Sequence, residues 1–262
     1  MTKSQFQVEQ LNELNSFDRN ETISLSINLK LQNDGINSLM KTISLFNNIQ
    51  NLYLSLSSNK IEEEGASQIA KALKKLKNLK DLTLILFGNN LKSKGGLELG
   101  KGLLYCNNLT VLTIKLSNSS LNYEGIQGIC SGISKCYNLN QLSLNLIGNL
   151  IRNGIELLGV TFSQLQQLQH IQLECDRNSI NEKSCIIFSD KIKKCAHLRS
   201  LHLNLQINEI MQGGVAMLES LITLPNLNFL RYNFRENKTD CTKNINQFKK
   251  RMKRVVIFQV QQ

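Results

Sequence analysis

Short runs in which leucine or isoleucine alternates with other residues recur along almost the whole chain. In one of them, Leu82, Leu84 and Leu86 occupy every second position, a pattern that predicts a β-strand with one buried face. The cores of these runs begin at Ile23, Leu52, Leu82, Leu112, Leu142, Ile171, Leu201 and Leu230. Because the intervals are all 29 or 30 residues, the sequence predicts a repetitive architecture of about eight units.

The second half of each unit has the period of a helix. After a loop glycine, Ala66, Ile69, Ala70 and Leu73 follow the spacing i, i+3, i+4, i+7, which predicts a helix with one apolar face. Equivalent apolar residues in successive units form columns that only stacked neighbours can bury. We therefore expect parallel strands on one side of the core and helices on the other.

A buried amide is predicted in the turn that leaves each strand. The equivalent positions hold Asn59, Asn89, Ser119, Asn149, Asn178 and Asn208. An inward asparagine can satisfy backbone groups of its turn, and stacked turns then form a ladder of amide hydrogen bonds. We interpret these asparagines as structural.

The unit resembles the leucine-rich-repeat family, in the class typified by ribonuclease inhibitor and the Ran GTPase-activating protein. In that class, a set of leucines is followed by an asparagine, a glycine and a helix. This chain matches the pattern, with two extra residues before the asparagine, at Leu79, Leu82, Leu84, Asn89, Leu91 and Gly95. The resemblance runs from Ile23 to about Phe234 and implies an α/β horseshoe with strands on the concave face and helices on the convex face. The extended repeat, rich in Asn, Gln, Lys and Ile, also resembles repeats of ciliated protist proteins, which implies a component of an assembly such as an axoneme.

Three segments are predicted. Residues 1–22 form an N-terminal cap, because Phe6, Leu11, Leu14 and Phe17 make an amphipathic pattern in which we place a helix. Residues 23–241 form the solenoid. Residues 242–262 form a basic capping helix and a final strand, which would be an exposed edge unless a neighbour pairs with it.

Composition and charge narrow the class of protein. A 262-residue chain with 41% hydrophobic and 19% charged residues should fold rather than remain disordered. No stretch reaches the roughly 18 apolar residues of a membrane span, and the first residues do not resemble a secretion signal. These features predict no membrane association and a cytoplasmic location, with the cilium or axoneme, or the nucleus, as alternatives.

The net charge of +11 is concentrated after Asp240, where six cations and no acid leave 11 − 6 = +5 for the rest. Five of these cations form a C-terminal basic patch: Lys249, Lys250, Arg251, Lys253 and Arg254. We interpret the patch as the solvated face of the capping helix. A nuclear-localisation signal, a nucleic-acid contact and a docking point for an acidic surface such as tubulin tails are the alternatives.

A second basic set follows the acids Glu62, Glu63 and Glu64 on one predicted helix. It consists of Lys71, Lys74, Lys75, Lys77 and Lys80. Acids early and lysines late complement the helix dipole, so we interpret this set as structural.

Catalytic, cofactor and metal residues are not signalled. Cys106, Cys136 and Cys195 share a column with leucines and are predicted to be core residues. The chain has no C-x-x-C pair and no histidine matched to a nucleophile. It has no phosphate-binding glycine loop either, because its paired glycines recur at one position of the repeat. We therefore predict a protein that is not an enzyme and holds no cofactor or metal.

The residues that alternate with the buried leucines should line the concave face. The candidate binding residues there are Tyr53, Ile85, Phe87, Lys115, Asn145, Glu174, Asp176, His202, Asn204, Arg231 and Arg235. Tyr53, Ile85 and Phe87 form an apolar group, whereas Glu174 and Asp176 lie near two arginines. We interpret the face as a protein-binding surface; the alternative is that scattered exposed apolar residues are normal on strands.

These features favour a non-enzymatic scaffold or adaptor that binds protein partners within a larger assembly. The resemblance to the Ran activator makes a small-GTPase regulator conceivable, but that protein works through an acidic tail and this chain ends basic. An RNA-binding accessory subunit acting through the basic C-terminus is the third hypothesis.

Overall fold

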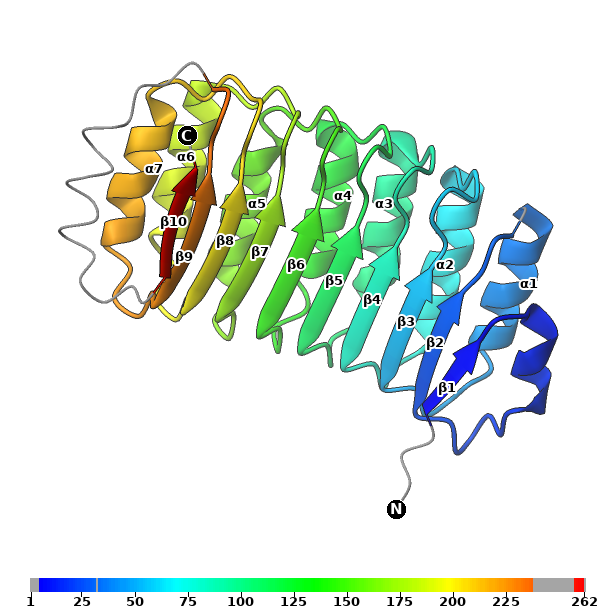
Figure 1. Ribbon diagram of the computed structural model, residues 1–262. Coiled ribbons are helices and arrows are strands. Elements are labelled where there is room, and N and C mark those ends of the chain that lie inside the picture. Colours follow the sequence, from blue (N-terminus) through cyan, green and yellow to red (C-terminus); the bar gives the residue numbers. More distant parts are fainter. Residues whose placement is uncertain (1–4, 32, 238–256, 262) are drawn as a thin grey trace.

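The computed structural model describes residues 5–31, 33–237 and 257–261, in which one parallel sheet is backed by a row of helices (Figure 1). The strands are β1 (Gln5–Val8), β2 (Ser24–Asn28), β3 (Asn51–Ser55), β4 (Asp81–Ile85), β5 (Val111–Lys115), β6 (Gln141–Asn145), β7 (His170–Glu174), β8 (Ser200–Asn204), β9 (Phe229–Asn233) and β10 (Ile257–Gln261). The helices are the 3-10 helix η1 (Leu11–Ser16) and the α-helices α1 (Asn33–Ile43), α2 (Glu63–Lys75), α3 (Lys92–Leu103), α4 (Tyr123–Ile133), α5 (Gly154–Gln164), α6 (Glu182–Ile192) and α7 (Gly213–Ile222).

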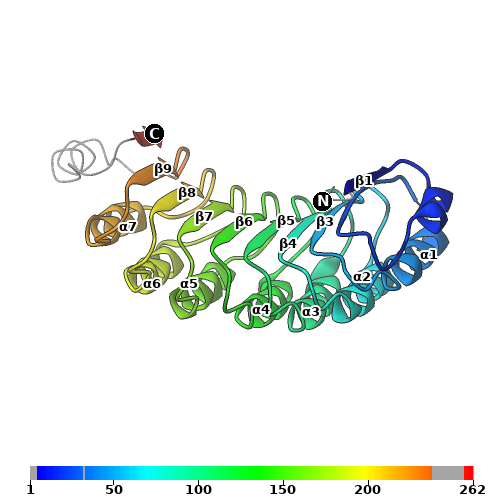
Figure 2. The same ribbon diagram turned by 90° about the horizontal axis from the view of Figure 1, so that it is seen from below.

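The sheet follows the order of the sequence. Each strand from β1 to β10 pairs in parallel with the next, so the described residues form a 10-stranded sheet. Figure 2 shows that the strands line the inner side of a shallow curve and that the helices lie on its outer side. The predicted leucine-rich-repeat solenoid is therefore confirmed, with strands on the concave face and helices on the convex face.

The core lies between the sheet and the helices. Leu82 pairs with Leu112 and Leu84 with Ile114, and all four side chains are buried. From the helix side, Ala66, Ile69 and Leu73 are buried as their spacing predicts. Because the same register is kept in every pair from β2 to β9, each column of leucines packs on the equivalent residues of its neighbours. The predicted start of the first strand core at Ile23 is wrong, because Leu25 is the residue that pairs with Leu52.

The asparagine ladder is also confirmed. The side-chain oxygen of Asn89 accepts hydrogen bonds from the backbone nitrogens of Asn59 and Ile61 in the preceding unit. Its nitrogen donates to the carbonyls of Leu56 and Leu86, and all four bonds measure 2.9 Å. One buried amide thus satisfies four backbone groups and joins two units.

Each ladder residue is preceded by a residue with left-handed backbone. Gly88 and Gly148, with φ of 66°, fill this position without steric cost. Ile207 fills it with φ of 53°, an unfavourable conformation for a β-branched side chain. A second left-handed residue differs between alternate units: Lys60, Ser120 and Ser179 directly follow the ladder residue, whereas Lys92, Arg152 and Met211 lie three positions after it. The loops therefore alternate between two conformations, which the repeat pattern did not predict.

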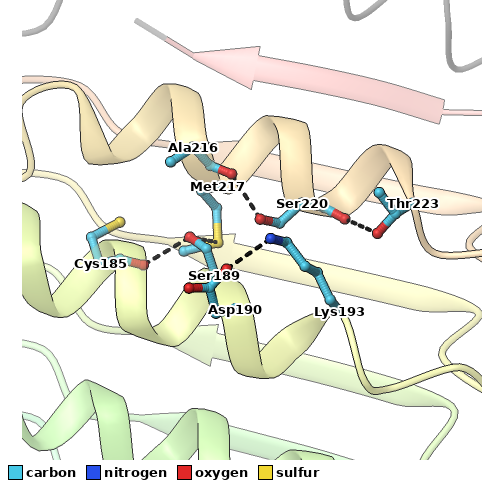
Figure 3. Close-up of polar contacts among 8 residues, drawn as sticks. All are labelled: Cys185, Ser189, Asp190, Lys193, Ala216, Met217, Ser220 and Thr223. Atoms are coloured by element: carbon cyan, nitrogen blue, oxygen red, sulfur yellow. Dashed lines mark hydrogen bonds and ion pairs between the residues drawn. The ribbon is translucent and has the colours of Figure 1, made fainter.

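Neighbouring helices use different small residues to pack closely against one another. Between α3 and α4 the backbones nearly touch: a Cβ added at Gly100 would lie 1.9 Å from the carbonyl oxygen of Gly128. Between α6 and α7, the hydroxyl of Ser189 donates a hydrogen bond of 2.7 Å to the carbonyl of Cys185 in its own helix. The same hydroxyl lies 3.5 Å from the sulfur of Met217 on α7 (Figure 3). Glycine at the first interface and satisfied hydroxyls at the second allow close contact without unpaired polar groups.

The N-terminal end differs from the predicted helix. Gln5–Val8 is a strand that pairs with β2, and Leu11–Ser16 is a 3-10 helix. The strand form is favoured because it continues the sheet and buries Val8, while the ring of Phe6 stacks on Phe17 with centroids 4.3 Å apart. The expectation of a single helix over this segment is therefore wrong.

At the C-terminal end, Ile257–Gln261 forms the expected last strand and pairs with β9. The predicted capping helix falls within residues 238–256, which lie outside the described residues. The basic patch of Lys249, Lys250, Arg251, Lys253 and Arg254 lies there too.

Candidate protein-binding face

The strand register arranges the residues of the concave face in columns that cross the sheet. One column, read from β2 to β9, is Asn28, Ser55, Ile85, Lys115, Asn145, Glu174, Asn204 and Asn233. A neighbouring column is Ser26, Tyr53, Thr83, Thr113, Ser143, Gln172, His202 and Arg231. The face is therefore apolar around β3 and β4, basic and amide-bearing at β5 and β6, and acidic at β7.

The apolar group lies on β3 and β4 and on the turn that follows β4. Tyr53 is 40% exposed and Phe87 is 46% exposed, whereas Ile85 is half-buried. Ile85 pairs with Ser55, two residue pairs beyond the pair of Tyr53 with Thr83, so these residues lie on the same face of the sheet. The three candidates thus occupy adjacent strands and present aromatic surface to solvent.

Lys115 and Asn145 separate the apolar group from the acidic one. Lys115 on β5 is exposed and pairs with Ile85 on one side and Asn145 on the other. The amide oxygen of Asn145 accepts hydrogen bonds from the hydroxyl of Ser117 and, at 3.2 Å, from the backbone of Ile147. Asn145 is therefore engaged within the protein, whereas the ammonium group of Lys115 is open to solvent.

The acidic cluster, defined as Glu174, Asp176, His202 and Asn204, lies where β7 meets β8. Oε1 of Glu174 lies 3.5 Å from Nδ1 of His202 and accepts a hydrogen bond of 3.2 Å from the amide of Gln172. Oδ2 of Asp176 accepts one of 3.0 Å from Nδ2 of Asn204. The structure brings these four candidates together from two adjacent units, 28 residues apart along the chain.

Charge and burial shift the titration of two members of this cluster. Burial, reinforced by the charge of Glu174, raises the pKa of Asp176 from its ordinary 3.8 to about 6. Burial and the charge of Arg231 lower the pKa of His202, against the opposing effect of Glu174. Because its pKa is lowered, His202 is uncharged at neutral pH and does not neutralise the carboxylate of Asp176.

Two oxygens of the cluster lack donors. Oδ1 of Asp176 and Oδ1 of Asn204 are buried and have no hydrogen-bond partner within the part of the chain that the structure describes. A buried carboxylate oxygen without a donor is costly, because it has lost its water and gained nothing in return. Both oxygens therefore retain unused acceptor capacity within the cluster.

The two candidate arginines differ in their relation to the cluster. Arg231 on β9 pairs with His202 and lowers its pKa, so it lies beside the cluster. Arg235 follows β9, is exposed, and is separated from Asp176 by the unit that contains β8. The sequence pattern grouped both with the acids; the register places the β8 side chains His202 and Asn204 in between.

A shallow depression of about 280 Å³ adjoins the cluster on the side where the strands begin. Its lining includes Thr113, Ser143, His170, Gln172, His202 and Phe229. His170 and Phe229 were absent from the candidate residues, although both stand at the first position of a strand, the same column as Asp81. The alternation that identified the other concave residues would have included them if extended by one pair.

The cysteine prediction is confirmed for the described residues. Cys106, Cys130, Cys136, Cys175, Cys185 and Cys195 are free and buried. Burial raises the pKa of Cys106, Cys130, Cys136, Cys185 and Cys195 to about 12, so these thiols remain protonated at neutral pH. They act as small apolar residues of the core.

The residues that the structure describes contain no group of three or more His, Cys, Asp or Glu side chains arranged to hold a metal ion. None of the helices in this part of the chain combines the length and the apolar character that crossing a membrane requires.

The sequence matches no known protein family and no curated protein. Among solved structures, internalin C2 from Listeria monocytogenes is 17% identical, with a TM-score of 0.48 over 87% of this chain and 83% of that one. This likeness is too distant to support any statement about function. The assignment of the chain to a leucine-rich-repeat fold therefore rests on its own repeat length, strand order and register.

Proposed function

We propose that this protein is a non-enzymatic scaffold that binds a protein partner on its concave face, with the acidic cluster as the polar anchor. The observation that carries the proposal is the pair of carboxylates, Glu174 and Asp176, which lie together on the concave face and form no ion pair with a lysine or arginine among the described residues. A lysine or arginine side chain of a partner would supply the donors and the positive charge that these groups lack.

The apolar group gives the partner a second anchor. Tyr53 and Phe87 expose aromatic surface of the kind that dominates binding energy at protein interfaces. Two strands, β5 and β6, separate this group from the acidic cluster, so one extended segment or one domain could contact both. We propose that an apolar side chain and a basic side chain of the same partner engage the apolar group and the acidic cluster, respectively.

The test compares variants of the full chain as bait in an extract of its native cells. Bound proteins are quantified by mass spectrometry for the wild type, for Glu174→Gln with Asp176→Asn, and for Tyr53→Ser with Ile85→Ser and Phe87→Ser. Glu219→Gln, an exposed position on α7, is the control for removal of an acid. We expect the same proteins to be lost from both concave variants and kept by the control; equal retention by all variants would refute the proposal.

Several finer hypotheses from the sequence belong to this proposal. We infer the ribonuclease-inhibitor-like class because an α-helix follows each strand from β2 to β8 on the convex side. Membership of a multi-subunit complex, a ciliary or axonemal location, contact with tubulin tails, regulation of a small GTPase and binding of RNA stay predictions. RNA binding and the tubulin contact depend on the C-terminal basic patch, which lies outside the described residues.

A further inference from the structure

The edge of the solenoid where helices end and strands begin carries a second, chemically different surface (lower edge of Figure 1). Its members come from the ends of α2, α3 and α4 and the turns that follow: Lys74, Lys75, Lys77, Lys80, Tyr105, Lys135 and Tyr137. We call this surface the lysine–tyrosine rim. All seven residues are exposed.

The lysines of the rim are not neutralised by neighbouring acids. Among the described residues, the ion pairs involve none of its five lysines. The nearby acid Glu98 is held by Lys101 at 2.5 Å, and Asp81, the other nearby acid, is half-buried on the strand side. The helix dipole explains why lysines are tolerated at the end of α2, but it does not explain positive charge that continues over three units.

The two tyrosines hold part of this charge in place. The ammonium groups of Lys77 and Lys74 lie 4.5 and 4.9 Å from the centre of the Tyr105 ring, and that of Lys135 lies 6.0 Å from the Tyr137 ring. Such contacts orient flexible lysines toward one region. Tyr105 is 40% exposed and Tyr137 is 57% exposed, so the phenol groups of both tyrosines are also available to a ligand.

A polar groove continues from the rim along the turns. It has a volume of about 540 Å³, and its lining includes Asn78, Lys80, Asn108, Thr110, Asn138 and Asn140. The amide nitrogens of Asn78, Asn108 and Asn138 donate to carbonyls of the preceding unit at 2.9, 2.9 and 3.0 Å. Their positions are therefore fixed, in a second asparagine ladder, and the amide of Asn108 joins the groove to Lys77.

We propose that the lysine–tyrosine rim and its groove bind an extended acidic segment of a protein, rich in Glu or Asp. Charge complementarity gives the sign of the ligand. The chemistry of the rim favours carboxylates over nucleic acid, because it contains lysines without arginine and because lysine ammonium groups cover ring faces on which bases would stack. This binding site is separate from the acidic cluster of the concave face, which would repel the same ligand.

The test measures binding of a fluorescein-labelled polyglutamate peptide to the full chain by fluorescence anisotropy at low salt. The variant replaces Lys74, Lys75 and Lys77 with Glu. The matched control places the same three charge reversals on the opposite edge, at Lys30, Lys60 and Lys183, which are all exposed. We expect the rim variant to bind about tenfold or more weakly than the control, and the affinity of the wild type to fall with added salt.

Further variants distinguish the rim from the other charged surfaces of the protein. Asp176→Asn should leave peptide binding unchanged, since that residue belongs to the concave face. A variant in which the C-terminal basic patch is neutralised should keep most of its affinity for the peptide; the residues changed are Lys249, Lys250, Arg251, Lys253 and Arg254. If this variant loses its affinity, binding belongs to the C-terminal patch and the proposal is overturned. Equal weakening in the rim and control variants, or tighter binding of an oligouridylate of equal charge, would overturn it as well. If the Glu variants unfold in a thermal melt, Lys→Gln substitutions at the same positions replace them.

Discussion

The side-chain amide of Asn204 on β8 donates a hydrogen bond of 3.0 Å to Asp176 in the neighbouring unit, while the other oxygen of that carboxylate is buried without a partner among the described residues. The half-buried carboxylate is therefore only partly satisfied, because one of its oxygens has lost water without gaining a partner. Asp176 is therefore a residue that the fold tolerates at a cost, which is the expected signature of a binding position.

The first prediction concerns the pH dependence of stability. Because burial raises the pKa of Asp176 from 3.8 to about 6, the unfolded chain releases this proton at lower pH than the folded chain. The ionised residue therefore lowers stability above about pH 6, and this cost is absent below about pH 4. Asp176→Asn should raise the thermal midpoint by about 2 to 4 °C near pH 7.5. The gain should vanish near pH 4, and a gain that is equal at both values would contradict the assignment.

A second prediction uses the close contact of α3 with α4. Gly100→Ala places a methyl group 1.9 Å from the carbonyl oxygen of Gly128, so backbone must move. We expect a loss of about 3 kcal/mol in the free energy of unfolding, measured by denaturant titration. Gly214→Ala on α7 is the control, since its added Cβ meets no atom closer than 3.6 Å. This change should stabilise the protein slightly, because alanine favours a helix over glycine by about 1 kcal/mol.

The asparagine ladder supplies a third prediction. Asn149 bonds the backbone nitrogens of Ser119 and Leu121 and the carbonyls of Leu116 and Leu146, at 2.8 to 3.1 Å. Asn149→Ala leaves these buried groups unpaired and should cost about 3 kcal/mol or more. Asn90→Ala, which removes only a side-chain bond of 3.1 Å to Glu62, should cost well under about 1 kcal/mol. Similar losses in the two variants would show that the buried amides are not specific supports of the turns.

A fourth prediction addresses backbone strain at Ile207. The equivalent residue two units earlier, in a loop of the same kind, is Gly148, and Asn118 also occupies this position with φ of 51°. Asparagine tolerates the left-handed region, so Ile207→Asn should raise the free energy of unfolding by about 1 kcal/mol. The control is the same change at Ile147, which directly precedes Gly148 and does not have positive φ. Ile147→Asn should bring no gain. Denaturant titration of both variants checks the difference.

The sequence alone determined the architecture, because a solenoid repeats one local unit and its evidence is periodic. The alternation of Leu82, Leu84 and Leu86 gave the strand face, the spacing of Ala66, Ile69 and Leu73 gave the helix face, and the recurrence of Asn89 and its equivalents gave the ladder. It also gave the residues of the concave face, since side chains alternate along a strand. Local rules of this kind need no knowledge of distant contacts.

Tertiary structure decided everything that depends on how neighbouring units meet. Only the register showed that Asn204 donates its side-chain amide to Asp176 and that His202 stands between Glu174 and Arg231. The strand at Gln5–Val8 forms because an existing sheet offers it partners, a long-range effect that its short amphipathic pattern could not reveal. The gathering of Lys74 and Lys77 over Tyr105 joins residues about thirty positions apart, so the sequence pattern assigned those lysines to their helix alone. Contacts across units combine burial, charge and hydrogen bonding, and the repeat pattern of one unit carries none of these.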